Sequence, residues 1–327
     1  MERDYRFDVA RVLSMSFIVV VAHLYGYIYN VKSAYFIPEC AIVTDACLGL
    51  FTFISGYLIG NKYIFSKLQR GGVWQFYKKR LLRIIPLFLL SAIVLYLIGF
   101  NSVRATLNGI LCISPFVKPR PMTLWYIPVI LLCYLITPIV CRKGFFWRFF
   151  CSLTIFLVLL VVKKVVPTID WRFQYNILFY FVGVVSAPFF DWKFHKTTFV
   201  KWLVVVLFIF FLVVSHCYTL NVHVKRLFAG VGVFAILFIC EGIANVLFNK
   251  EKSNVMSRLI INVSYASMVC YMFHRLFFWG GELLWNPSIH WIKWGYMAGI
   301  VFPVMIFLSY YIQCGYDKLL NILSYKK

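Results

Sequence analysis

Acidic residues are scarce in this chain of 327 residues, which has 11 Asp and Glu against 33 Lys and Arg. Polar linkers, low-complexity tracts and repeats of about 20 to 50 residues are also lacking, which argues against appended domains and solenoids. The ten cysteines are scattered singly without a CxxC pair, so we predict no structural metal. We expect a single membrane-embedded domain over residues 1–327.

Apolar residues, in contrast, are abundant: 62% of the chain is hydrophobic and 20% is aromatic, far more than a water-soluble core of this size needs. A helix that crosses roughly 30 Å of hydrocarbon needs about 20 mainly apolar residues, and such stretches recur along the chain. Long apolar runs also differ from the alternating pattern of a membrane barrel. The sequence therefore predicts an all-α, polytopic transmembrane bundle of about ten helices.

The basic residues indicate how the spans are oriented. We predict spans near residues 10–29, 46–64, 84–101, 124–141, 149–166, 173–190, 202–219, 227–248, 259–281 and 295–315. Lys and Arg are roughly twice as numerous in the alternate segments that include both termini as in the rest of the chain. Cytoplasmic segments carry such an excess, so we predict that both termini are cytoplasmic. The net charge of +22 is then a topology signal and predicts no nucleic-acid partner.

Ionisable residues within predicted spans are candidates for function, because they are costly to bury in hydrocarbon. They are Arg11, His23, Asp45, Glu241, His274, Arg275 and Glu282. His23 lies about 18 Å beyond Arg11 along a helix, and a buried neutral imidazole can take a proton from a hydroxyl group. The same imidazole could instead serve only to bond a neighbouring helix.

Arg80 and Arg83 lie three residues apart, so they share one helix face at the cytoplasmic mouth of the predicted third span. Two guanidinium groups suit a phosphorylated ligand, although lipid headgroups could be the only phosphates they meet. Pro86 reads as a proline at the start of a helix. The basic and aromatic stretch before it, residues 61–83, is typical of a segment at the membrane interface.

Three further features are candidates for either packing or chemistry. The small pair Ser55 and Gly56 allows another helix or a ligand to approach closely. His274 and Glu282, eight residues apart, share a helix face and could pair through water or a substrate. Glu241 is a lone acid in an apolar stretch, so we expect it to be protonated or paired with an arginine or histidine.

Five motifs, in order, resemble those of the acyltransferase 3 family, whose members are multi-span bacterial enzymes that O-acylate cell-surface glycans. They are the opening Asp8-x-x-Arg11 followed by His23, the FTFISGYLIG segment at 51–60, Arg80-x-x-Arg83-Ile84-x-Pro86, Leu124-Trp125-Tyr126 with Tyr134 and Pro138, and Ser264 through Tyr271 to His274. The resemblance covers residues 5–315.

The resemblance implies an acyl-CoA donor, most often acetyl-CoA, and a glycan or lipid-linked sugar hydroxyl as acceptor. It implies that His23 is the general base, that Arg11 orients donor or base, and that Arg80 and Arg83 hold the CoA phosphates. It also implies a location in the bacterial cytoplasmic membrane, in contact with membrane lipids. Asp8, Asp45, Ser55, Gly56, Trp125, Glu241, His274 and Glu282 are further candidates.

One spacing departs from the family. Arg11 and His23 are twelve residues apart, whereas the family usually has eleven, almost a whole number of turns. In a regular helix the two side chains would point about 120° apart unless a π-bulge restores the register. This spacing leaves open an assembly subunit with a degenerate site. A transporter or flippase for a lipid-linked or acylated sugar is a second alternative, because intramembrane His, Glu and Arg also mark transport paths.

Overall fold

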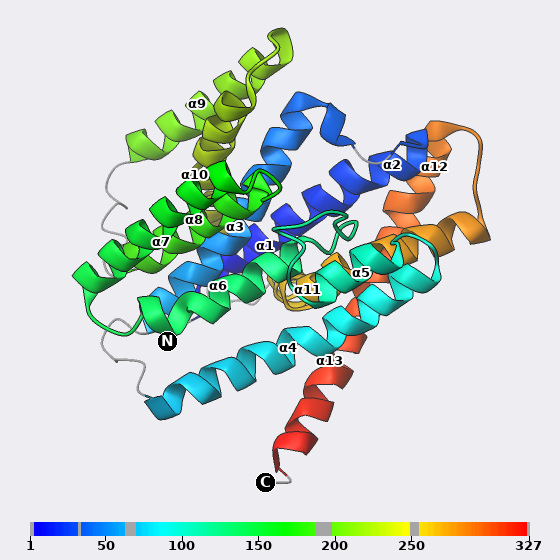
Figure 1. The fold of residues 1–327 in the computed structure, drawn as a ribbon. Helices are drawn as coiled ribbons and strands as arrows, with labels where there is room; N and C mark the ends of the chain where they lie inside the picture. The colour runs from blue at the N-terminus through cyan, green and yellow to red at the C-terminus, as the bar shows by residue number, and fades with distance from the viewer. Residues whose placement is uncertain (1–2, 32–33, 63–69, 188–197, 249–254, 326–327) are drawn as a thin grey trace. The chain divides into compact units, whose positions relative to one another are not determined.

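The structure is a computed structural model that describes residues 3–31, 34–62, 70–187, 198–248 and 255–325. Every regular element in these ranges is a helix, which confirms the predicted all-α class (Figure 1). The elements are α1 (Tyr5–Ser16), η1 (Phe17–His23), α2 (Leu24–Tyr29), η2 (Ala34–Phe36), α3 (Pro38–Lys62), α4 (Arg70–Leu97), α5 (Val103–Ile110), α6 (Tyr126–Val140), α7 (Phe145–Val165), α8 (Trp171–Ser186), α9 (Thr198–Cys217), α10 (Val222–Phe248), α11 (Val255–Leu284), α12 (His290–Tyr296), η4 (Met297–Val301) and α13 (Phe302–Tyr325).

Eight helical stretches within the described ranges are long and apolar enough to cross a membrane. Two shorter helices, α6 and α8, coincide with the fourth and sixth predicted spans. Each of the ten predicted spans therefore has a helix, and the chain is a polytopic membrane protein. The orientation of the termini stays a prediction.

Two predicted boundaries were wrong. The second span starts at Pro38, so Asp45 lies two turns inside α3 instead of at its beginning. The third starts at Gly72, and Pro86 is inside α4, not at a helix start. The helix continues through the stretch before Pro86, which includes the good helix formers Gln75, Lys78, Lys79 and Arg80. Lys67 lies outside the described residues.

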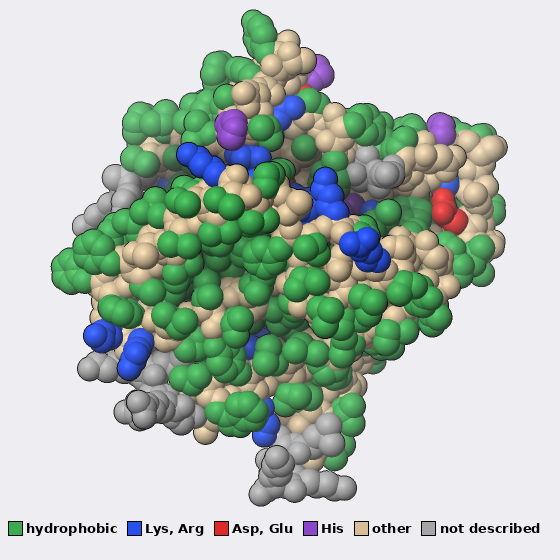
Figure 2. All heavy atoms as spheres, in the orientation of Figure 1, with side chains coloured by type: hydrophobic (Ala, Val, Ile, Leu, Met, Phe, Trp, Pro, Cys, Tyr) green, Lys and Arg blue, Asp and Glu red, His purple; other side chains and the backbone are tan. Residues whose placement is uncertain are grey.

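The surface of the long helices is apolar, as a lipid environment requires. Only 11% of the apolar window of α7 and 17% of that of α9 are buried within the protein. Phe146, Phe199 and Phe210 are among their exposed side chains. Figure 2 shows hydrophobic side chains over most of the visible surface. Exposed apolar area on this scale marks a membrane-facing surface.

The helices form two compact units. The first consists of residues 1–50 and 198–327, in which α11 packs against α1 and α13, and α10 packs against α1 and α9. The second consists of residues 51–197, in which α4 packs against α5 and α6, and α7 against α8. The prediction of one acyltransferase domain stays a prediction.

In the second unit, α3 and α8 approach each other at glycines. A methyl group on Gly56 would collide with the carbonyl oxygen of Tyr180, and one on Gly183 would collide with that of Phe53. Only glycine allows two helix backbones to lie so close. The Ser55 hydroxyl, next to Gly56, lies 3.5 Å from that of Tyr134. The prediction of close helix packing at Ser55 and Gly56 is therefore confirmed.

Candidate active site

Two histidines from distant parts of the sequence meet inside the first unit. His23 ends η1 and His274 lies on α11, and the two side chains are almost fully buried, at 4% and 0% exposure. His23 Nδ1 lies 2.8 Å from His274 Nε2, and the two rings are parallel within 1°. The pair is therefore linked by a hydrogen bond that one nitrogen must donate and the other must accept.

The surrounding hydrogen bonds decide which nitrogen donates. His274 Nδ1 lies 2.8 Å from the backbone carbonyl oxygen of Tyr271, which can only accept, so Nδ1 carries the proton. Because a neutral imidazole has one donor and one acceptor, His274 Nε2 accepts from His23 Nδ1. His23 Nε2 is then left as a lone-pair acceptor. The network assigns this tautomer in the way that a carboxylate does in a catalytic triad.

The acceptor nitrogen of His23 faces a hydroxyl group. Tyr35 Oη lies 3.2 Å from His23 Nε2, and the two rings meet edge to face. Tyr35 belongs to the short η2 turn between α2 and α3. Sequence reasoning missed this residue because it lies between spans, where a tyrosine is unremarkable. The structure thus gives His23 the neighbours of a general base: a ring that fixes its tautomer and a hydroxyl on its lone pair.

A π-helix places His23 in this position. Residues Phe17–His23 are π-helical, and the Leu24 N–H donates to the Val19 carbonyl five residues earlier. Each such turn holds one residue more than an α-helical turn, so it absorbs the extra residue between Arg11 and His23. Asp8 reaches Ser264 of α11 and His23 reaches His274 of the same helix. The π-bulge that the spacing required is therefore present.

Asp8 and Arg11 form a charged cluster at the start of this helix. The buried Asp8 carboxylate accepts from Arg3 Nε at 2.8 Å and from the Ser264 hydroxyl at 2.7 Å. Arg11 Nη1 lies 3.7 Å from the same carboxylate. Asp8 therefore links Arg3 and Arg11 to α11, the helix that also carries His274.

Glu241 and Glu282 are both paired with lysines. Lys201 Nζ lies 2.8 and 2.9 Å from the two carboxylate oxygens of Glu241, and Arg6 Nη1 lies 3.9 Å from one of them. The sequence predicted that Glu241 is protonated or paired with an arginine or histidine, whereas its nearest partner is Lys201 and Arg6 lies farther away. Lys293 Nζ lies 2.6 Å from Glu282.

His274 and Glu282, which could pair through water or a substrate, have separate direct partners in the structure. Both ring nitrogens of His274 are engaged, with His23 and with the Tyr271 carbonyl. The buried Lys293 Nζ instead joins Glu282 to the backbone carbonyl of Tyr27, also at 2.6 Å. Eight residues on a helix span two turns, so the Glu282 carboxylate pairs with the nearer ammonium group of Lys293 on α12.

The remaining candidates lie mostly in the second unit. Arg80 and Arg83 lie on one side of α4; the Arg80 guanidinium stands 5.4 Å above the Tyr134 ring, and Arg83 is exposed. Trp125 is buried under the guanidinium of Arg172 at 4.2 Å. Within the described ranges, no group of three or more His, Cys, Asp or Glu side chains could hold a metal ion.

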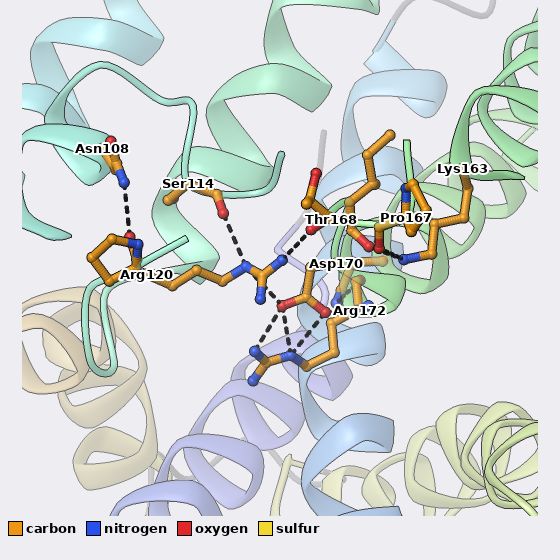
Figure 3. A network of polar contacts seen from close by, with 11 residues as sticks. Asn108, Ser114, Arg120, Lys163, Pro167, Thr168, Asp170 and Arg172 are labelled. Carbon is orange, nitrogen blue, oxygen red and sulfur yellow. Dashed lines mark hydrogen bonds and ion pairs between the residues drawn. The ribbon is translucent and has the colours of Figure 1, made fainter. Parts of the chain in front are cut away.

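A second buried polar network surrounds Asp170, which caps α8 (Figure 3). Its carboxylate accepts from the Arg172 backbone at 2.9 Å and from Arg172 Nη2 at 2.7 Å, and lies 3.3 Å from Arg120 Nε. Burial by itself would raise the pKa of Asp170, but the hydrogen bonds and charge of Arg172, with the charge of Arg120, hold that pKa below its ordinary value.

Arg120, one of the two partners of Asp170, is itself bonded to loop backbone. Arg120 donates to the carbonyl oxygens of Ser114 at 3.0 Å and Thr168 at 2.7 Å. Lys163 donates to the carbonyls of Pro167 and Ile169 beside them (Figure 3). This network holds the loop before α6 against the loop before α8, so its role is structural.

The comparisons with known proteins agree with the motifs. The family model described as an acyltransferase domain matches residues 4–314, nearly the whole chain. No curated protein and no solved structure matches the chain significantly. With the five motifs in order and a multi-span helical fold, the chain belongs to the acyltransferase 3 family and is a membrane acyltransferase.

Proposed function

We propose that this protein is an O-acetyltransferase of the bacterial cytoplasmic membrane, which moves an acetyl group from acetyl-CoA to a hydroxyl of a surface glycan or glycolipid. The observation that carries the proposal is the His23 and His274 pair, which leaves His23 Nε2 as an acceptor against a hydroxyl group. Hydroxyl oxygens attack thioesters slowly unless a base removes the proton as the bond forms.

In the proposed reaction, the acceptor oxygen attacks the acetyl carbonyl carbon while its proton passes to His23 Nε2. The C–S bond of acetyl-CoA then breaks, and the leaving thiolate takes the proton from His23. His274 Nε2 accepts from His23 Nδ1 throughout, which stabilises the imidazolium that forms. No covalent enzyme intermediate is required in this reaction, because the acceptor oxygen attacks the acetyl carbon directly.

The donor site of the proposal rests on Arg80 and Arg83. Guanidinium groups bind phosphate oxygens through two parallel hydrogen bonds, and CoA carries phosphates at its nucleotide end. Arg83 is exposed and Arg80 is partly buried over Tyr134, which supports a pair that a phosphate group can reach. In the predicted orientation this end of α4 faces the cytosol, where acetyl-CoA is found.

A transporter receives less support from the buried charges. Ion-coupled transporters need carboxylates or histidines that bind and release their ion during the cycle. Asp8, Glu241 and Glu282 are each paired with Lys or Arg at 2.8 Å or less. These charges serve packing, and they give no specific support to a transport path.

The test compares surface glycans from cells with and without the protein by mass spectrometry. The proposal predicts glycans that carry acetyl esters only when the protein is present. Acetyl-CoA binding to the purified protein should be lost in the double variant Arg80→Glu, Arg83→Glu and retained in Arg142→Glu, a control at a cytoplasmic position of the predicted topology. Identical glycan masses would reject the proposal.

A further inference from the structure

The His23 base is enclosed within the protein. Its side chain is 4% exposed, Nδ1 is bonded to His274, and Nε2 faces Tyr35. Tyr35 itself is only partly buried. An acceptor hydroxyl that approaches from the loop between α2 and α3 therefore meets the Tyr35 hydroxyl before it can meet His23.

The segment that carries Tyr35 is fixed and does not resemble a hinged lid. Ala34, the neighbour of Tyr35, is 1% exposed and packs against Ala22 and Cys40, and Ala22 directly precedes His23. The turn leads into α3, where the Ile37 N–H donates to the Ala34 carbonyl at 3.0 Å. Moving the backbone of the η2 turn would break this apolar cluster, so the turn places the Tyr35 ring beside His23.

We infer that Tyr35 relays the proton from the acceptor hydroxyl to His23, an inference that rests on the proposed function. The phenol O–H donates to His23 Nε2, and the phenol oxygen keeps lone pairs that can accept from the acceptor hydroxyl.

The relay step balances atom by atom. As the acceptor oxygen bonds to the acetyl carbon, its proton moves to the Tyr35 oxygen and the Tyr35 proton moves to His23 Nε2. His23 Nε2 then returns this proton to the Tyr35 oxygen while the Tyr35 proton passes to the thiolate of CoA, so Tyr35 ends as a neutral phenol and His23 as a neutral imidazole. This arrangement suits an alcohol as the acceptor, one that approaches from the side of the η2 turn.

The test is Tyr35→Phe, with Tyr25→Phe as its matched control. Tyr25 packs in the same region and contacts Tyr29 and Phe36 through its ring. Transfer of radiolabelled acetyl groups from acetyl-CoA to envelope glycans is measured in membranes at equal protein abundance. We expect kcat in Tyr35→Phe to fall about 100-fold with the KM for acetyl-CoA unchanged, and Tyr25→Phe to match the unaltered protein.

Other results have distinct meanings. Equal or faster transfer by Tyr35→Phe would overturn the relay, because the hydroxyl would then merely cover His23. No transfer by the unaltered protein would instead overturn the proposed function itself. If Tyr35→Phe is poorly produced, a fluorinated tyrosine at position 35 keeps the hydroxyl and lowers its pKa. The alkaline limb of the pH–rate profile should then move to lower pH, and an unmoved limb would overturn the relay.

Discussion

Two of the buried polar clusters in the described part of the chain, around His23 and around Asp170, use opposite chemistry. Around His23 the groups are imidazoles and a phenol, joined in a chain that ends on a lone pair. Around Asp170 the groups are ions, with one carboxylate between the guanidinium groups of Arg120 and Arg172, and Arg120 also donates to loop carbonyls. The first can accept a proton on the lone pair of His23 Nε2, while His23 Nδ1 keeps its hydrogen bond to His274. The second would lose several hydrogen bonds if its proton count changed.

The comparison shows how to separate function from structure among costly buried groups. A cluster in which opposite charges compensate each other has a structural role, as at Asp170, Glu241 and Glu282. A cluster that orients one unprotonated nitrogen towards a hydroxyl is suited to catalysis. Burial alone does not distinguish them.

The largest expected effect comes from changing the register of His23. One alanine inserted between Val20 and Val21 adds a residue beyond what the π-helix absorbs, so His23 turns away from His274. We expect acetyl transfer to fall about 10²- to 10⁴-fold, the usual contribution of a general base. Deletion of Val21 should convert η1 to an α-helix and keep most of the activity, because the family spacing is then restored. A deletion as damaging as the insertion would argue against this view of the π-helix.

Breaking the ionic cluster around Asp170 should lower the stability of the fold and not act on catalysis directly. Asp170→Ala leaves two guanidinium groups without their buried carboxylate and removes the cap of α8. We expect a loss of about 3–5 kcal/mol in the free energy of unfolding, measured by thermal unfolding in detergent. Asp170→Asn keeps a capping side chain and should lose less. Equal stability of Asp170→Ala and the unaltered protein would contradict the assignment.

A variant of His274 tests the proposed catalytic role of the His23 cluster. His274→Phe keeps an aromatic ring against His23 but removes the acceptor that fixes its tautomer. We expect transfer to fall about 10- to 100-fold, as for other positioning partners, with unchanged thermal stability. Proton-sensitive ¹⁵N signals of His23 should show a mixture of tautomers in this variant and a single one in the unaltered protein. A single unchanged tautomer in both would refute the role of His274.

The smallest effect is a dependence of stability on acid. The pKa of Asp170 is lowered in the folded protein, so its contribution is complete above the unfolded pKa of about 3.9 and is lost as the pH falls through the folded value. The unfolding temperature should therefore drop more steeply below about pH 4 in the unaltered protein than in Asp170→Asn. Parallel curves would show that the carboxylate is not stabilised by folding.

The sequence predicted the helices well because apolar runs record lipid burial directly. It misplaced the start of α4, since the basic and aromatic residues from Gly72 to Arg83 do not form an apolar run although they extend the helix. It found His23 and His274 but not their contact, because 251 residues separate them and nothing in the spacing of either reports the other. The spacing of Arg11 and His23 indicated that a π-bulge was needed but not where it would lie. Nothing in the sequence pointed to Tyr35.

The central claim is that His23 is the base of an acetyl transfer, and it is tested most directly by His23→Ala. Transfer of labelled acetyl groups from acetyl-CoA to envelope glycans is measured in membranes, beside His223→Ala as a control at an exposed position. We predict that His23→Ala retains at most about 1% of the transfer at equal abundance and that His223→Ala retains all of it. Substantial transfer by His23→Ala would contradict the account.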